Sequence, residues 1–193
     1  REVHLDEIAS MLNMDPVQLR LLNLTHPRLR RVLTKATDEF NWPSRSTGTS
    51  LGFGVAIGYD AGSYVAECVQ LAVEGKEVIV QRVVAAFDCG LVLNPDGVRN
   101  QVEGSIMMGI GTALWEAVEF HGGRPLNPSF SRYRVPRITD APQIEVVLVG
   151  DPATPSTGAG EPGIVPIVAA VANAVYNTTG SRIQELPIVR HLL

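Results

Sequence analysis

The chain has few of the residues that build metal sites in proteins. Its 193 residues include two cysteines and four histidines. Cys68 and Cys89 are too far apart for a CxxC motif, and each histidine stands alone, so zinc or iron–sulfur ligand spacing does not occur. We therefore expect two buried thiols in a reducing environment and no metal ion held directly by protein side chains.

An excess of positive charge and long apolar runs are missing as well. The formal net charge is −4, which gives no electrostatic argument for a nucleic acid or an anionic membrane as a partner. No run reaches the roughly 18 apolar residues that a membrane-spanning helix needs. Small molecules and proteins are the partners that we expect.

The start of the chain, Arg1-Glu2-Val3-His4, has neither an initiator methionine nor the apolar core of a signal peptide. We expect a piece of a longer protein or a subunit, and the sequence does not distinguish a cytoplasmic from a periplasmic location. Nucleophile and phosphate-binding motifs of the GxSxG, GxxxxGK[ST] and GxGxxG types are not found in a fitting context.

What the chain does contain is enough apolar sequence for a substantial core, since 45% of the residues are hydrophobic and 19% are charged. The first forty residues have a helical pattern, with an N-cap at Asp15-Pro16 and another helix that opens at Pro27. Residues 41–50 are typical of a linker. We predict a helical segment over 1–43 and an α+β part over 44–193.

Beyond the linker the pattern changes to that of strands. Runs at 51–59, 63–73 and 77–87 predict an antiparallel region, with a tight hairpin at Glu74-Gly75-Lys76. A turn is expected at 94–97, then a helix over 98–116. The glycines in that helix suggest a close approach, either to a ligand or to another packed element. Short strands at 118–120 and 144–149 complete an α+β fold, with an antiparallel or mixed sheet and packed helices.

The most informative feature is a carboxylate among glycines, in Gly158-Ala159-Gly160-Glu161-Pro162-Gly163, ahead of an apolar helical run over 164–176 that Gly180 ends. Three interpretations fit the residues alone. Glu161 could complement the dipole of a helix, act as a general base in a pocket, or anchor a partner chain. The first interpretation is the simplest one.

Ordered motifs along the chain change that ranking. They are Phe87-Asp88-Cys89-Gly90, Asn94-Pro95-Asp96-Gly97-Val98, Gln101-Val102-Glu103-Gly104, Tyr133-Arg134-Val135-Pro136, Ala141-Pro142-Gln143-Ile144, and the Gly-Glu-Pro segment itself. In this order they resemble the C-terminal part of molybdenum hydroxylase large subunits, the xanthine dehydrogenase and aldehyde oxidase family. Within that family, the large (β) subunits of the isoquinoline 1-oxidoreductase type are the most similar.

The resemblance implies a molybdopterin cofactor, in its cytosine dinucleotide form, whose molybdenum is held by the pterin. It implies that Glu161 is the active-site base of a hydroxylation that uses water as the oxygen source. It also implies that Gln101, Gly158, Ala159 and Gly160 contact the cofactor. The substrate would be an N-heterocycle or an aldehyde.

The expected partners are the remainder of the large subunit and a small subunit that carries iron–sulfur clusters. On its own the chain is expected to be inactive and not to retain the cofactor. An aldehyde-oxidising or carbon monoxide dehydrogenase-type relative, and a non-catalytic assembly or binding module, remain as alternatives.

Overall fold

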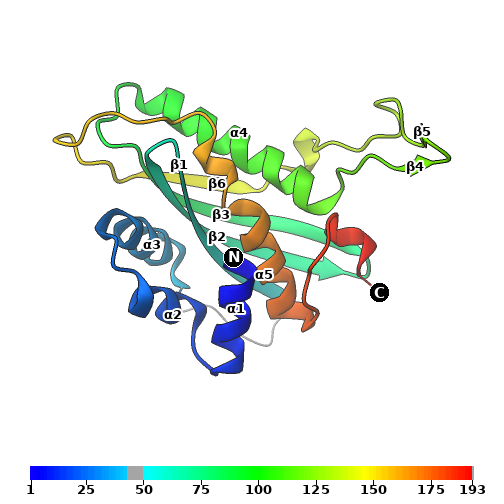
Figure 1. Ribbon diagram of the computed structural model, residues 1–193, viewed down its shortest axis with the longest axis horizontal. Coiled ribbons are helices and arrows are strands. Elements are labelled where there is room, and N and C mark those ends of the chain that lie inside the picture. The colour runs from blue at the N-terminus through cyan, green and yellow to red at the C-terminus, as the bar shows by residue number, and fades with distance from the viewer. Residues whose placement is uncertain (43–49, 193) are drawn as a thin grey trace.

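The computed structural model describes residues 1–42 and 50–192. The longer elements are α1 (Glu2–Met11), α2 (Pro16–Asn23), α3 (Pro27–Phe40), β1 (Leu51–Asp60), β2 (Ser63–Glu74), β3 (Glu77–Asp88), α4 (Pro95–Leu114), β6 (Gln143–Leu148) and α5 (Ile167–Thr179). Shorter ones are β4 (Phe120–His121), β5 (Arg124–Pro125) and the 3₁₀ turns η2 (Ile138–Asp140), η3 (Pro162–Ile164) and η4 (Ile188–Arg190). A twisted sheet lies between α3 on one face and α4 with α5 on the other (Figure 1).

The N-terminal helices form where the sequence predicts them. Asp15 accepts hydrogen bonds from the backbone N–H groups of Val17 at 2.8 Å and Gln18 at 3.2 Å, which makes it the N-cap of α2. Helix α3 buries Val32, Leu33 and Ala36 against the sheet. The predicted division between 43 and 44 falls in 43–49, outside the described residues.

The sheet has the strand order β1-β2-β3-β6. Strands β1, β2 and β3 are antiparallel neighbours, as the sequence predicts, and β6 is parallel to β3. Helix α4 lies between β3 and β6 in the chain and provides the long connection that a parallel pair needs. The α+β class and the mixed sheet are therefore confirmed.

Two glycines explain how closely the helices on the second face approach their neighbours. A Cβ atom on Gly109 of α4 would lie 2.0 Å from the side chain of Ile167 on α5. A Cβ on Gly54 of β1 would lie 2.0 Å from the carbonyl oxygen of Ala170. The close approach expected at Gly109 is therefore to another helix of this chain, not to a ligand.

Two local predictions need correction. Residues 94–97 are not a separate turn, because Asn94 caps α4 and Pro95 is its first residue. Proline at the first helical position is compatible with a helix, since the missing N–H would have no partner there. The helix predicted from 164 begins at Ile167 instead, because η3 turns the chain first.

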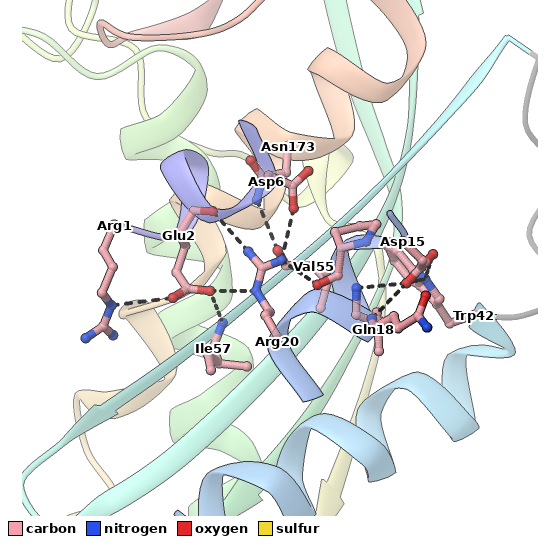
Figure 2. A network of polar contacts seen from close by, with 12 residues as sticks. Arg1, Glu2, Asp6, Asp15, Gln18, Arg20, Trp42, Val55, Ile57 and Asn173 are labelled. Carbon is pink, nitrogen blue, oxygen red and sulfur yellow. Dashed lines mark hydrogen bonds and ion pairs between the residues drawn. The ribbon is translucent and has the colours of Figure 1, made fainter. Parts of the chain in front are cut away.

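A buried ionic network joins the first two helices (Figure 2). The Arg20 side chain is almost fully buried and bonds Glu2 at 2.9 Å and Asp6 at 3.0 Å. Its guanidinium also donates to the backbone carbonyls of Glu2 and Pro16. Across 1–42 and 50–192, no helix is long and apolar enough to cross a membrane.

Candidate functional site

Three segments of the chain meet around one hollow of about 310 Å³. They are the residues that follow β3, the first turns of α4, and the loop 151–160. The lining residues are Cys89, Leu91, Leu93, Asn94, Gly97, Val98, Gln101, Ser156, Ala159 and Gly160. Of the four residues that the resemblance names as cofactor contacts, Gln101 lies beside Ala159 and Gly160 here, although about sixty residues separate it from them in the sequence. The fourth, Gly158, and the predicted base Glu161 do not line the hollow.

The turn after β3 is fixed by the buried carboxylate of Asp88. Its Oδ1 accepts a 3.0 Å hydrogen bond from the N–H of Gly90, which has a positive φ of 69°. Arg28 binds both carboxylate oxygens, at 2.8 and 3.1 Å, and Arg31 binds one of them. Arg28 and Arg31 belong to helix α3, on the far face of the sheet, so α3 helps to fix the turn that forms one wall of the hollow.

The two arginines and the N–H of Gly90 strongly favour the ionised form of the Asp88 carboxylate. Burial by itself would raise the pKa of Asp88. The hydrogen bonds from Arg28, Gly90 and Arg31 outweigh burial and lower that pKa to about 2. Asp88 is therefore a fixed negative charge that shapes the turn.

Loop 151–160 is tied to the body of the protein at several points. The N–H of Thr157 donates to the carbonyl of Cys89 at 2.9 Å, and the N–H of Gly158 donates to the carbonyl of Ala61 at 3.1 Å. The buried hydroxyl of Ser63 donates to the carbonyl of Gly158. These bonds hold Ala159 and Gly160 against the hollow.

The glycines of the Gly-Glu-Pro segment have different reasons to be there. A Cβ on Gly158 would lie 2.6 Å from Ala61, and one on Gly163 would lie 3.0 Å from Ser105. Packing inside this chain thus leaves no room for a side chain at Gly158 and little room for one at Gly163. A Cβ on Gly160 would meet only the Gln101 side chain, at 3.6 Å, so Gly160 is free of such a constraint and opens onto the hollow.

Glu161 lies directly after that opening. Glu161 is exposed and precedes the short 3₁₀ turn η3, while the long helix α5 starts only at Ile167. Glu161 is therefore too far from the start of α5 to act mainly as a residue that complements the dipole of that helix. Within the described ranges, its carboxylate forms no hydrogen bond or ion pair. The role of Glu161 as a base stays a prediction.

Sequence reasoning missed several residues of this region. The hydroxyls of Ser63 and Ser105 bond the carbonyls of Gly158 and Gly160. Leu91 and Leu93 line the hollow with apolar side chains. None of these four residues stands in a sequence pattern that predicts its role. Asp88 was not missed: the sequence predicts that its side chain bonds the backbone of the following turn, and its hydrogen bond from the N–H of Gly90 confirms this.

Comparison with known proteins identifies the fold. Residues 4–142 match the family model described as the molybdopterin cofactor-binding domain. The chain is 31% identical to a nicotinate dehydrogenase subunit of Pseudomonas putida, over 97% of this chain and 17% of that protein. It is 33% identical to the isoquinoline 1-oxidoreductase β subunit of Brevundimonas diminuta, over 97% of this chain and 25% of that protein.

Among solved structures, the aldehyde oxidoreductase of Desulfovibrio desulfuricans superposes with a TM-score of 0.86 at 18% identity. That match covers 100% of this chain and 40% of the other. The chain spans a quarter or less of the two curated relatives. With 139 of its residues inside the matching model, the chain belongs to the molybdopterin cofactor-binding domain family of molybdenum hydroxylase large subunits.

Proposed function

We propose that this chain supplies one wall of the cofactor site in a molybdopterin-dependent hydroxylase, with Glu161 as the general base. The observation that carries the proposal is the place of Glu161 in the chain, directly after Gly160, which lines the hollow. The Glu161 side chain is exposed and has no hydrogen-bond or ion-pair partner within 1–42 and 50–192. A general base needs such an accessible carboxylate within reach of the proton that it removes.

Three features of this mostly apolar hollow suit contact with one part of a polar cofactor. Gly160 leaves room for a group from outside, and the Gln101 side chain offers both a donor and an acceptor. The N-terminus of the 20-residue helix α4 faces the same space and favours negative charge such as phosphate. We propose that Gln101, Ala159 and Gly160 contact the cofactor, in its cytosine dinucleotide form, and that Gly158 positions them.

When bound, the molybdenum cofactor supplies the oxidising chemistry, with water as the source of oxygen. Glu161 would accept a proton on a carboxylate oxygen as the nucleophile forms. Leu91 and Leu93 would limit the access of water from one side. The electrons would pass to iron–sulfur clusters on a separate small subunit.

We infer that the substrate is an N-heterocycle or an aldehyde. The similar relatives are named for nicotinate and isoquinoline, and the superposed structure is named for an aldehyde. Assay of the complete enzyme with N-heteroaromatic compounds and with aldehydes tests this inference. Activity with neither class would contradict it.

The cofactor site is tested by Gly160→Ala in the complete enzyme. Inside this chain a methyl group at residue 160 meets no atom closer than 3.6 Å, so the fold should be kept. We expect a lower molybdenum content at an unchanged thermal midpoint. Wild-type molybdenum content and turnover would contradict the placement of the cofactor beside Gly160.

A further inference from the structure

The two edges of the main sheet differ in whether the outward-facing backbone groups of the edge strand are bonded. The free edge of β1 is closed by side chains that bond alternate backbone groups (Figure 2 shows two of them). These bonds join the N–H of Phe53 to Asn177 at 3.0 Å, the carbonyl of Val55 to Asn173 at 3.1 Å, and the N–H of Ile57 to Glu2 at 3.1 Å. No further strand can pair there without breaking them. Such blocking is a common protection of edge strands.

The opposite edge is only half covered. β6 pairs with Arg82–Phe87 of β3, and no strand among the described residues pairs with the first five residues, 77–81, on that side. A β-bulge at Gln81 marks the change, because Val80 pairs with Leu71 while Arg82 pairs with Gln70. Pro142 precedes β6 and has no N–H, so this chain does not extend β6 along the open edge.

A groove of about 890 Å³ lies beside the open edge. Ile110, Leu114 and Trp115 from the end of α4 line it, and so do Val189 and the residues 139–143. Its rim is held by Arg134, which bonds Asp140 at 3.0 Å and stacks its guanidinium 4.1 Å from the centre of the Trp115 ring. The groove therefore offers one apolar wall, formed by Ile110, Leu114, Trp115 and Val189, next to a strand edge that no other strand of the described chain pairs with.

We propose that an extended segment occupies this groove and adds to β3 as a strand along residues 77–81. Five residues of strand are about 17 Å long. Strand addition would satisfy alternate N–H and C=O groups of the edge and place alternate side chains against the apolar wall. A small apolar molecule would leave the backbone groups unpaired, which is costly next to a buried wall.

The occupant is a segment of the same large subunit that lies outside this chain. This step rests on the proposed function only in taking the chain as part of such a large subunit, since it spans a quarter or less of its curated relatives. The side chains of Val78 and Val80 already face the core, so the incoming strand would continue an existing apolar layer.

Residue-resolved hydrogen exchange on the complete, assembled enzyme tests the pairing. If a strand is added, all the amides of 77–81 should exchange as slowly as those of Val83–Phe87. If the edge is open, or holds only a small molecule, alternate amides of 77–81 should exchange fast, and that result would overturn the proposal.

Photo-crosslinking identifies the occupant. A crosslinking amino acid at exposed Thr139, on the groove, should form a product with one segment of the large subunit outside these 193 residues. The same group at Lys35, on the other side of the sheet, should not give that product. A product with a second copy or with another subunit would overturn the assignment, as would no product at all.

The molybdenum content and turnover of the same preparation separate this inference from the proposed function. Slow exchange at 77–81 in an enzyme that binds no molybdenum would support strand addition and contradict the proposed function. Fast exchange at 77–81 in an active, molybdenum-loaded enzyme would support the proposed function and contradict strand addition.

Discussion

The hydroxyl of Ser105 donates a 3.2 Å hydrogen bond to the carbonyl oxygen of Gly160. This bond joins α4, which carries Gln101, to the segment that carries Glu161. The Cβ of Ser105 also lies 3.0 Å from the place where a Cβ of residue 163 would stand, so the two elements are in direct contact. Ser105 thus helps to fix the position of the predicted base relative to the predicted cofactor contact.

We predict that Ser105→Ala in the complete enzyme loosens this junction. Loss of a partly buried hydrogen bond should cost about 1 kcal/mol of stability and leave the carbonyl of Gly160 without this donor. Turnover should fall more than molybdenum content, since a small displacement of Glu161 affects proton transfer most. Ser105→Cys, which keeps the size of the side chain, serves as a comparison. Equal losses of metal and turnover would argue for a purely structural role.

A second prediction concerns Asp88 and acid. The folded-state pKa of Asp88 is lowered to about 2 from an ordinary value of 3.8, so its contribution to stability is present above pH 4 and is lost as the pH falls towards 2. Asp88→Asn should cost about 2–3 kcal/mol at pH 7, because it leaves Arg28 and Arg31 without their charge partner. Thermal midpoints of the complete subunit from pH 7 to pH 3 measure this.

The contribution of Asp88 is confirmed if wild type and Asp88→Asn converge at low pH. A difference between them that stays constant down to pH 3 would contradict the pairing with arginine. Asp151→Asn, in an exposed part of the loop, is a suitable control.

Glu67 gives a prediction of opposite sign. It lies on β2 between Ala56 and Ala85 in the register, fully buried, and neither carboxylate oxygen has a hydrogen-bond partner in the described part of the chain. Burial raises the pKa of Glu67 well above its ordinary value of 4.5. The unfolded chain loses this proton as the pH rises above 4.5 while the folded chain keeps it, so stability falls in that range.

Glu67→Leu should therefore stabilise the complete subunit at pH 7 by about 1–3 kcal/mol. The leucine side chain has a volume similar to that of glutamate but no polar atoms that lack a hydrogen-bond partner. Glu67→Gln should abolish the same pH dependence but stabilise less, since the amide stays unsatisfied. Thermal midpoints at pH 5 and pH 8 separate the two variants. A wild-type stability that rises between these pH values relative to Glu67→Leu would contradict a buried neutral acid.

Local patterns were enough to predict much of this fold. The cap at Asp15, the apolar face of α3, and the hairpin of β2 and β3 all depend on residues within a few positions of each other. The parallel pairing of β6 with β3 depends on how α4 packs, which no short window of sequence contains. The start of α4 was placed too late because Asn94-Pro95-Asp96-Gly97 suits a turn and a capped helix equally well.

Fewer contacts of the candidate site than of the fold could be predicted from the sequence. The resemblance pointed to five residues: Gln101, Gly158, Ala159, Gly160 and Glu161. Gln101, Ala159 and Gly160 line the hollow while Gly158 and Glu161 do not, and all contacts with a cofactor stay a prediction. The clamp of Arg28 on Asp88 joins residues sixty positions apart, and the partners of Glu2 and Asn173 on β1 are equally remote. Such long-range bonds depend on the completed fold and leave no local signal.

The role of Glu161 is tested most directly by Glu161→Gln in the complete enzyme, with turnover and molybdenum content measured on one preparation. The matched control is Glu185→Gln, a second exposed glutamate. We predict unchanged molybdenum content and a kcat lower by about 10²–10⁴-fold for Glu161→Gln, the usual effect of losing a general base, with wild-type values for the control. Near-normal turnover of the loaded Glu161→Gln enzyme would contradict the account.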